Sequence, residues 1–311
     1  MSGFCRRLLG KTGLQVSPLG IGGGNGIESR DLLYAFERGI NYFFFSSDLH
    51  HMSYQRSAEA LKTLCGKDSS VRDQVVLATV SYVDDPSKLI AAILDQFGEL
   101  GIDYIDVFHW GWILAEHDVA TLLRSARELH EGGSVTQHYR VLESLEQAQS
   151  INAELIQRGL ARYVGMSFHS LRAARSVINE IDVMMLRYNL ANTRVERHIV
   201  PLLSGNKESD PGIVVFNTAH EGIFHLNAPP PGYPVGLRVP SIPDCYRFAL
   251  SQPWVDVVLT GVANRQEIDQ ALAALEQGPL SEDEATFYRE YGTLFEPQNL
   301  AQNSWLSPAQ A

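Results

Sequence analysis

Short β-rich segments alternate with helical segments along almost the whole length of this 311-residue chain. The β-rich segments are continuous apolar runs, as in residues 74–80 (QVVLATV), which is typical of strands buried on both faces of a sheet. The helical segments are amphipathic and commonly end at glycine, as in residues 31–39 (DLLYAFERG). Because parallel strands need long crossovers of this kind, the alternation predicts an α/β fold.

The strand count favours a closed barrel, since about eight βα units are present and a parallel barrel needs that number. A doubly wound sheet would need fewer strands and an early dinucleotide fingerprint, which the glycine-rich residues 20–26 (GIGGGNG) do not match. We therefore predict a (β/α)8 TIM barrel and interpret residues 20–26 as a tight turn between strand and helix. The predicted strands are residues 16–23, 40–45, 74–80, 104–112, 161–168, 181–189, 211–219 and 255–261.

Two segments interrupt the regular alternation. A polar helical segment at about residues 113–137 is longer than a normal connection, and we interpret it as an insertion that forms either an interface or a rim of the pocket. Residues 225–243 are too rich in proline and glycine for regular structure and predict a stiff loop over the barrel mouth. No Pro/Ser-rich linker divides the chain, so residues 1–311 are expected to form a single domain.

Composition excludes several classes of partner. The net charge of -11 argues against nucleic acid, whose phosphates this surface would repel. No apolar run is long enough to predict a membrane span, and the N-terminus lacks the apolar segment of a secretory signal. Three widely spaced cysteines (Cys5, Cys65 and Cys245) are typical of reduced thiols, so a cytoplasmic protein is expected, with Cys65 facing the core.

Several segments resemble, in order, those of the aldo-keto reductase family. Residues 9–24 (LGKTGLQVSPLGIGGG) resemble its opening, where a short hairpin closes the bottom of the barrel. Residues 159–170 (GLARYVGMSFHS) resemble its fifth strand, and residues 248–272 its last strand and cofactor loop. The resemblance covers roughly residues 9–272 and implies a (β/α)8 barrel, NADPH bound without a Rossmann domain, and reduction of a carbonyl group in a small-molecule substrate.

The resemblance also implies four catalytic positions, and all four differ here. In the family an aspartate and a lysine assist a tyrosine that donates a proton, and a histidine orients the carbonyl. Anchoring on the segment at residues 56–57 places Phe45 at the aspartate and His50 at the tyrosine. A one-residue shift of the strand instead places Phe44 and Leu49 there, which restores neither residue.

The other two positions are anchored by separate motifs. The lysine is replaced by Val80, and the histidine position holds Gly111, with His109 one layer below it. We expect that the usual proton relay is absent.

The cofactor positions implied by the resemblance are partly kept. Ser167 stands where a Ser-Asn pair holds the nicotinamide carboxamide, but Phe168 replaces the asparagine. Met185 replaces a glutamine, Thr218 occupies the assigned position of an aromatic stacking residue, and Ala271 replaces a helix asparagine. The positions expected to meet the cofactor are Ser167, Gly222, Gly261, Asn264 and Arg265.

Several histidines map to the carboxyl ends of the predicted strands, where a barrel enzyme builds its site. They are His50, His51, His109, His169, His220 and His225, accompanied by the carboxylates Asp48 and Glu221. Histidine titrates near neutral pH and is a suitable proton donor. We predict His50, His109 and Asp48 as the catalytic residues, with His50 replacing the tyrosine.

Three interpretations remain open from the sequence. The first is an NADP-dependent oxidoreductase with a remodelled, histidine-rich site. The second is a repurposed barrel in which His50, His109 and His169 hold Fe, Cu or Zn, or act as acid–base groups without a hydride. The third is a non-catalytic binding or regulatory barrel. A histidine in the middle of a barrel strand, such as His109, is also typical of a hydrogen-bonded core residue. A homo-oligomer is compatible with all three interpretations.

Overall fold

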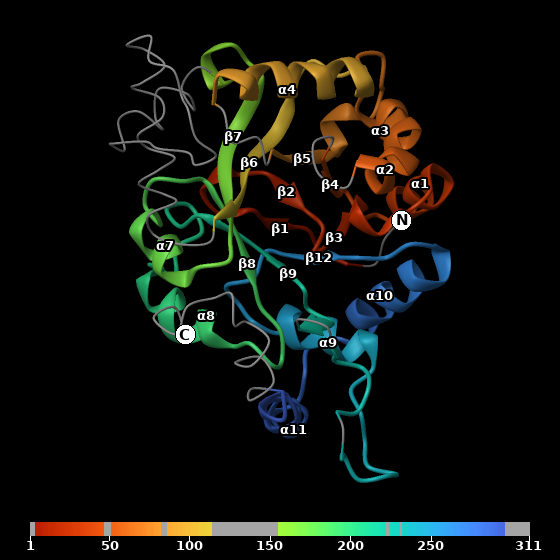
Figure 1. Cartoon of the computed structure of the whole chain (residues 1–311), viewed down its shortest axis with the longest axis vertical. Coiled ribbons are helices and arrows are strands. Elements are labelled where there is room, and N and C mark those ends of the chain that lie inside the picture. The colour runs from red at the N-terminus through yellow and green to blue at the C-terminus, as the bar shows by residue number, and fades with distance from the viewer. Residues whose placement is uncertain are drawn as a thin grey trace.

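Eight parallel strands close into a barrel, in the order β12-β3-β4-β5-β6-β7-β8-β9 (Figure 1). The computed structural model describes residues 4–46, 51–81, 86–113, 155–221, 224–230 and 232–295. The predicted (β/α)8 TIM barrel is confirmed. Its strands are β3 (Leu19–Gly22), β4 (Tyr42–Phe45), β5 (Val76–Ser81), β6 (Ile105–Ile113), β7 (Ala161–Phe168), β8 (Val183–Arg187), β9 (Gly212–Phe216) and β12 (Val257–Thr260).

The strands are buried on both faces, which explains their continuous apolar sequences. All four residues of β4 and all six of β5 are buried. Buried carboxylates fix the amino-terminal ends of neighbouring strands: Asp106 accepts a hydrogen bond from the backbone nitrogen of Leu77 at 2.9 Å, and Asp256 accepts one from Ile213 at 2.8 Å. Arg72 and Lys207 neutralise these two carboxylates, so the charges are paired where they are desolvated.

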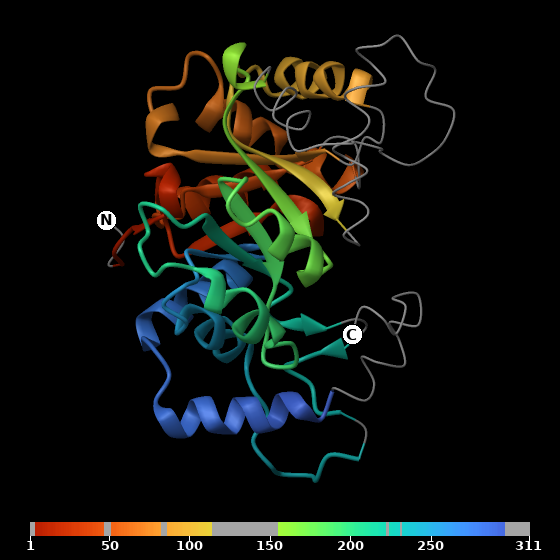
Figure 2. The same cartoon turned by 90° about the vertical axis from the view of Figure 1, so that its left-hand side faces the viewer.

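Amphipathic helices cover the outside of the barrel, with α4 and α11 at opposite ends of the long axis (Figures 1 and 2). In α10 the residues Ile268, Ala271 and Leu272 face the core, and Asn264 caps the helix by accepting a hydrogen bond from Glu267. The α-helices are α1 (Ser29–Glu37), α2 (His51–Tyr54), α3 (Ala58–Cys65), α4 (Pro86–Leu100), α7 (Leu171–Ser176), α8 (Arg194–His198), α9 (Ile242–Leu250), α10 (Arg265–Gln277) and α11 (Glu282–Thr293).

The expected amino-terminal hairpin is present as β1 (Arg7–Leu8) and β2 (Gln15–Val16). Leu9, between the two strands of the hairpin, closes the bottom of the barrel: a Cβ atom added at Gly212 would lie 2.7 Å from the Leu9 side chain. A second hairpin, β10 (His220–Glu221) and β11 (Phe224–His225), was not predicted from the sequence.

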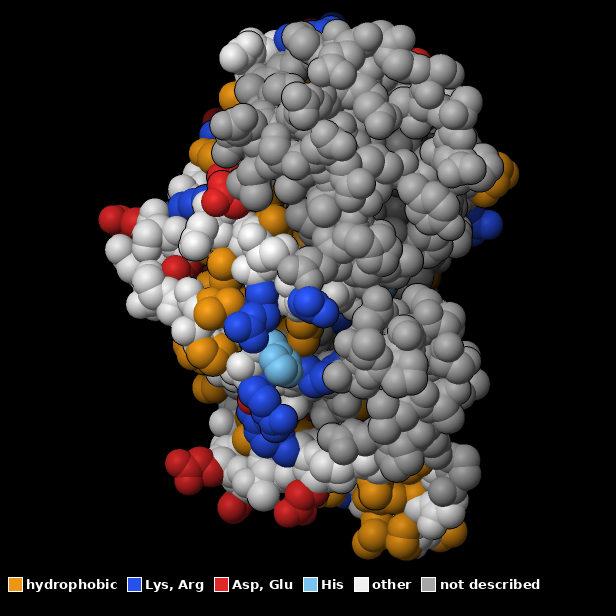
Figure 3. Space-filling model, turned by 60° about the vertical axis from the view of Figure 1, so that its left-hand side comes forward, with side chains coloured by type: hydrophobic (Ala, Val, Ile, Leu, Met, Phe, Trp, Pro, Cys, Tyr) orange, Lys and Arg blue, Asp and Glu red, His pale blue; other side chains and the backbone are white. Residues whose placement is uncertain are grey.

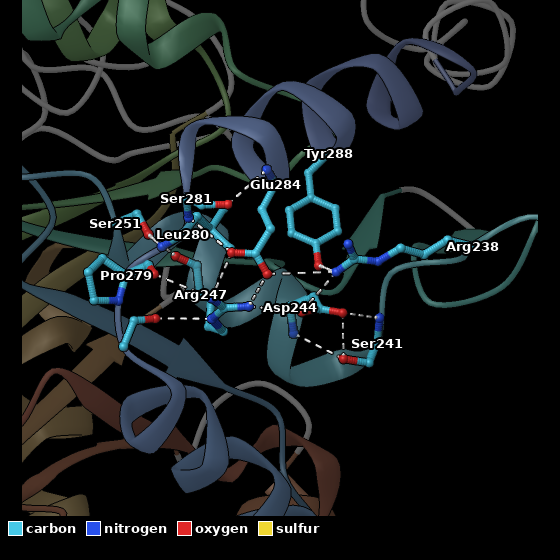
Figure 4. Close-up of polar contacts among 11 residues, drawn as sticks. Arg238, Ser241, Asp244, Arg247, Ser251, Pro279, Leu280, Ser281, Glu284 and Tyr288 are labelled. Atoms are coloured by element: carbon cyan, nitrogen blue, oxygen red, sulfur yellow. Dashed lines mark hydrogen bonds and ion pairs between the residues drawn. The ribbon is translucent and has the colours of Figure 1, made fainter.

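The proline-rich loop is shorter than predicted. His225 belongs to β11 and Ile242 begins α9, so the loop spans residues 226–241, where the described part contains only turns and bends. We call this segment the strap. It is fixed to α11 by polar contacts (Figure 4), in which Arg238 donates to the Tyr288 hydroxyl and Arg247 of α9 pairs with Glu284. The strap is therefore anchored on the same helix that packs on α9.

Some predictions concern residues that the structure does not describe. Ile113 ends β6, and the rest of the predicted insertion at 113–137 lies outside the described residues. Cys65 and Cys245 are buried free thiols, as expected for Cys65, and Cys5 is exposed and free. Among the described helices, none has the length and apolar character needed to cross a membrane.

Candidate functional site

A cavity of 690 Å³ opens at the carboxyl ends of the barrel strands. Six of the eight barrel strands contribute to its wall, which is the usual position of a ligand site in this fold. The strand residues that line it are Gly22, Phe44, Ser167, Met185, Phe216, Leu259 and Thr260.

The pairing of the strands decides which side chains face the barrel interior. Phe44 lines the cavity and pairs with Ala78, and partnered residues of parallel strands point to the same face. Val80, two residues beyond Ala78, therefore also points inward, whereas Phe45 points outward and packs on Tyr54. Of the two registers considered from the sequence, the one that places Phe44 at the aspartate position, and with it Leu49 at the tyrosine position, matches this pleat. The assignment of Phe45 and His50 to these positions stays a prediction.

His109 lies in the packed interior of the barrel and does not line the cavity. Its side chain is completely buried, its Nδ1 atom lies 3.3 Å from the Thr79 carbonyl oxygen, and its ring meets the edge of Phe44. Burial lowers the pKa of His109 to about 4, so the ring is neutral at physiological pH. This position fits the core-histidine interpretation better than a catalytic one.

His169 does line the cavity, directly after β7. Its ring packs on Phe216 with 5.6 Å between centroids. Burial, together with the nearby positive charge of Arg187, lowers the pKa of His169 to about 4. A neutral imidazole therefore faces the cavity and can both donate and accept a hydrogen bond.

The proposed metal ligands do not form a described cluster. Within the residues that the structure describes, no group of three or more His, Cys, Asp or Glu side chains is placed to hold a metal ion. His109 and His169 therefore do not complete a three-ligand site with other described residues. His50, Asp48 and Gly222 lie outside the described residues, and of His51 only the backbone, at the start of α2, is described.

The predicted cofactor positions fall into two groups. Ser167 and Gly261 line the cavity, and the Gly261 carbonyl accepts a hydrogen bond from Asn25 Nδ2 at 2.5 Å. Asn264 and Arg265 instead line a neighbouring hollow of 480 Å³ at the start of α10.

In that hollow, Arg265 lies beside Arg30 of α1. Arg265 Nε is 3.2 Å from the Asp31 carboxylate and its guanidinium lies over the Tyr34 ring. The Asn264 side chain is used for capping, because its Oδ1 accepts from Glu267 N at 3.1 Å. Asp31 also lines the hollow, and Arg30 lies 3.7 Å from its carboxylate and 3.1 Å from that of Glu28. The two guanidinium groups outnumber the one carboxylate that lines the hollow, and together with the helix amino terminus they suit it to an anion.

Three aromatic residues of the cavity were not predicted from the sequence: Phe216, Tyr54 and Tyr246. Phe216, at the carboxyl end of β9, is half-buried, whereas Thr218, which also lines the cavity, is only 2% exposed. Phe216 is thus better placed than Thr218 to stack on a planar ligand. Tyr54 of α2 also lines the cavity and packs on Phe44. Inward alternation from Val214 to Phe216 was the sequence signal that would have identified the first of them.

A polar network fixes the β10–β11 hairpin at the edge of the cavity. The carboxylate of Glu221 is buried, accepts from Asn189 Nδ2 at 2.7 Å and pairs with Arg187 at 3.3 Å. The hairpin brings the rings of His220 and His225 into a stack with centroids 4.3 Å apart, and both rings line the cavity. Three histidines therefore border one wall.

The closed barrel, with its main cavity at the carboxyl ends of the strands, places the molecule among the (β/α)8 barrel proteins that bind ligands at this face. Residues 28–229 match the model of the aldo/keto reductase family, and the chain belongs to that family.

Solved structures agree in fold. The holo form of aldo-keto reductase AKR11C1 from Bacillus halodurans is 19% identical, with a TM-score of 0.67, over 92% of this chain and 96% of that one. Its apo form gives 21% identity and a TM-score of 0.61, over 92% and 95% of the two chains. A protein from Pseudomonas aeruginosa is 18% identical, with a TM-score of 0.59, over 87% and 96%. None of the curated proteins matches.

Proposed function

We propose that this protein is an NADP-dependent oxidoreductase that acts on an uncharged small carbonyl compound without the family's Asp/Lys/Tyr relay. The observation that supports it most directly is that the two candidate cofactor regions are lined by residues close together in the chain, at the start of α10. Gly261 lines the 690 Å³ cavity, and Asn264, three residues further on, lines the hollow that contains Arg30 and Arg265.

The residues present fit the two ends of a nicotinamide dinucleotide. At one end the Ser167 hydroxyl and the ring of Phe216 line the same cavity, which suits an amide and a planar ring. At the other end, Arg30 and Arg265 suit a phosphate group. When bound, the cofactor supplies a hydride, and the chain's own residues must hold it, exclude water and deliver a proton.

Phe44 and Val80 point inward, and neither side chain can supply a proton or a charge to the site. A phenyl ring and an isopropyl group carry no titratable proton, so they cannot lower the pKa of a neighbouring donor by charge. The proton must then come from another group. We keep His50, with Asp48, as the proposed donor in the segment that follows β4, one residue after the tyrosine position of the Phe44 register. We also propose the neutral His169 as a hydrogen-bonding partner of the substrate.

The first experiment is a titration of the purified protein with NADPH, followed by cofactor fluorescence. Saturable binding that weakens about tenfold in Ser167→Ala and in Phe216→Leu supports the proposal. The same sample, assayed for oxidation of NADPH with a panel of aldehydes and ketones, tests turnover. His50→Ala is expected to abolish turnover while binding persists, and full activity of that variant would exclude His50 as the donor.

Two other outcomes favour the alternative functions. Stoichiometric Fe, Cu or Zn in the purified protein, lost in His169→Ala, would support the metal-dependent alternative, whose ligands would have to include residues outside the described part. Tight ligand binding with no turnover would support a non-catalytic barrel. The observation that favours this alternative is that Phe44 and Val80, both apolar, face the interior where the resemblance expects charged catalytic residues.

A further inference from the structure

We propose that the face formed by α7 and α8 is a docking surface for an acidic protein. Four arginines lie on it, all exposed: Arg172 and Arg175 on α7, and Arg194 and Arg197 on α8. We call them the arginine quartet. Figure 3 shows Lys or Arg side chains gathered around a histidine on this side of the molecule.

The two helices present their arginines on one surface. α7 and α8 contact each other, and their buried residues Ala173, Ala174 and Val195 face the barrel. Each helix carries its two arginines three residues apart, a spacing that places both side chains on the same side of a helix. The quartet is therefore two arginine pairs, one on each of two helices in contact.

The one acidic residue of α8, Glu196, does not neutralise the arginines on either side of it, Arg194 and Arg197. Glu196 of α8 is held by Arg289, whose two nitrogens lie 3.0 and 2.9 Å from its carboxylate oxygens. Arg175 and Arg197 make no ion pair within the part of the chain that the structure describes. In a chain of net charge -11, Arg175 and Arg197 thus form a local reversal of sign.

The chemistry of the quartet favours carboxylates on a protein over other anions. Guanidinium groups bind carboxylates through two parallel hydrogen bonds, and carboxylates three or four residues apart on a helix match the spacing of both arginine pairs. A nucleic acid would meet repulsion from the net charge of the whole molecule. A second copy in a twofold arrangement would place this face against itself, arginine against arginine.

The position of the quartet connects it with the cavity. Ser170 caps α7 and directly follows His169, which lines the cavity wall. A protein docked on α7 and α8 therefore lies beside the cavity mouth. Its binding does not require the proposed cofactor, so the two proposals can fail independently.

The test is binding of a fluorescein-labelled glutamate decamer to the full-length protein, followed by fluorescence anisotropy at low salt. The double variant Arg175→Glu/Arg197→Glu is expected to weaken binding by about tenfold or more, and added salt should do the same to the wild type. Lys62→Glu/Lys67→Glu makes the same change in net charge on α3 and the following loop, and is expected to stay within about twofold of wild type.

Three results would overturn the proposal. One is equal affinity of the decamer for the two double variants. Another is tighter binding of a DNA duplex of similar charge than of the decamer. The third is a fall of more than about 4 °C in the melting temperature of Arg175→Gln/Arg197→Gln, because it would show that the arginines make contacts within the protein itself. A folded, equally stable glutamine variant that loses the decamer supports docking.

Discussion

Phe44 and Val80 face the interior of the barrel at the place where the resemblance expects an aspartate and a lysine. Phe44 pairs with Ala78 across β4 and β5, so Val80 is its diagonal neighbour on the inner face. Both side chains are buried, Val80 completely. The interior of this region is therefore packed for apolar groups, and a single charge introduced there has no partner.

Phe44→Asp is accordingly expected to destabilise the protein by about 3 kcal/mol or more, since it creates a cavity and buries an unpaired carboxylate. Phe44→Asp/Val80→Lys should recover part of that loss, because the two new charges are close enough to pair. Urea denaturation of the wild type, both single variants and the double variant measures the coupling. Strict additivity of the two changes would show that the positions do not face each other.

The two buried histidines make stability depend on pH. The pKa of His109 and that of His169 are each lowered to about 4, below the ordinary value of 6.5. The unfolded chain therefore binds more protons between those values. The free energy of unfolding is therefore highest above about pH 6.5. It falls as the pH drops toward 4, by up to about 3 kcal/mol for each histidine.

This prediction is checked by urea denaturation at several pH values between about 4 and 8. His109→Leu should remove roughly half of the pH dependence in that range. His198→Asn, on the partly exposed position of α8, is the control and should leave the pH profile unchanged. An identical profile in His109→Leu would contradict the assignment of a neutral, buried ring.

Site residues were harder to predict than the packing around them. Sequence motifs could not decide between Phe44 and Phe45, because three phenylalanines in succession satisfy burial in either register. Only the pairing with β5 identifies the inward one. The stacking position was assigned to Thr218 because the sequence does not locate the end of β9 to the residue. The replacement of the lysine by Val80 stays a prediction, and it depends less on register because that strand is anchored by its own motif.

At the level of elements, α11 holds the strap that borders the cavity. The Tyr291 hydroxyl donates to the Ala228 carbonyl at 2.8 Å, and the rings of Tyr233 and Tyr291 meet edge to face. The attachment of α11 depends on Arg247, whose side chain is 8% exposed and donates to both oxygens of Glu284 at 2.9 and 3.0 Å. This hydrogen bonding keeps the pKa of Glu284 low.

Glu284→Ala should therefore lower the free energy of unfolding by about 2 kcal/mol, because the buried guanidinium loses its carboxylate and α11 loses its capping box with Ser281. Glu282→Ala, in the same first turn but exposed, is expected to cost less than about 0.5 kcal/mol. Chemical denaturation measures both. Equal effects in the two variants would show that the Arg247 contact contributes little to stability.

The elements themselves were largely evident in the sequence. Each barrel strand is an apolar run bounded by turn residues, because both of its faces are buried, and β7 (Ala161–Phe168) was predicted with its observed ends. The β10–β11 hairpin was missed because its strands are two residues long and three of their four side chains are polar. Its pairing depends on the buried Glu221 and its partners, a tertiary contact that no local pattern encodes.

Considered as a whole, the molecule divides its candidate cofactor region between a cavity with few charges and a hollow in which two arginines meet one lining carboxylate, Asp31. The described wall of the cavity carries a single charged residue, Glu267, which is already bonded to Ala263 N and Asn264 Nδ2. The hollow carries Arg30 and Arg265, with exposed side-chain fractions of 73% and 58%. A ligand that spans both regions should therefore be anchored by charge only at its phosphate end.

This asymmetry predicts a preference for NADPH over NADH, which differ by the 2′-phosphate. If NADPH is present at about 100 times its dissociation constant, it should stabilise the protein by about 2.7 kcal/mol, and the rise in melting temperature is measured by differential scanning fluorimetry. NADH at equal concentration should give a smaller rise. Arg30→Gln/Arg265→Gln should remove the difference between the two cofactors, because the remaining contacts are common to both.

Arg38→Gln provides the matched control, since Arg38 also joins α1 to α10, through Asp269 at 2.9 Å, but lies at the other end of α1. It should keep the preference for NADPH. If Arg30→Gln/Arg265→Gln retains that preference while Arg38→Gln loses it, the phosphate is bound elsewhere along α1 and α10. If neither cofactor stabilises the wild type, the cavity does not bind the family's cofactor. The wall bordered by His169, His220 and His225 must then bind a different ligand.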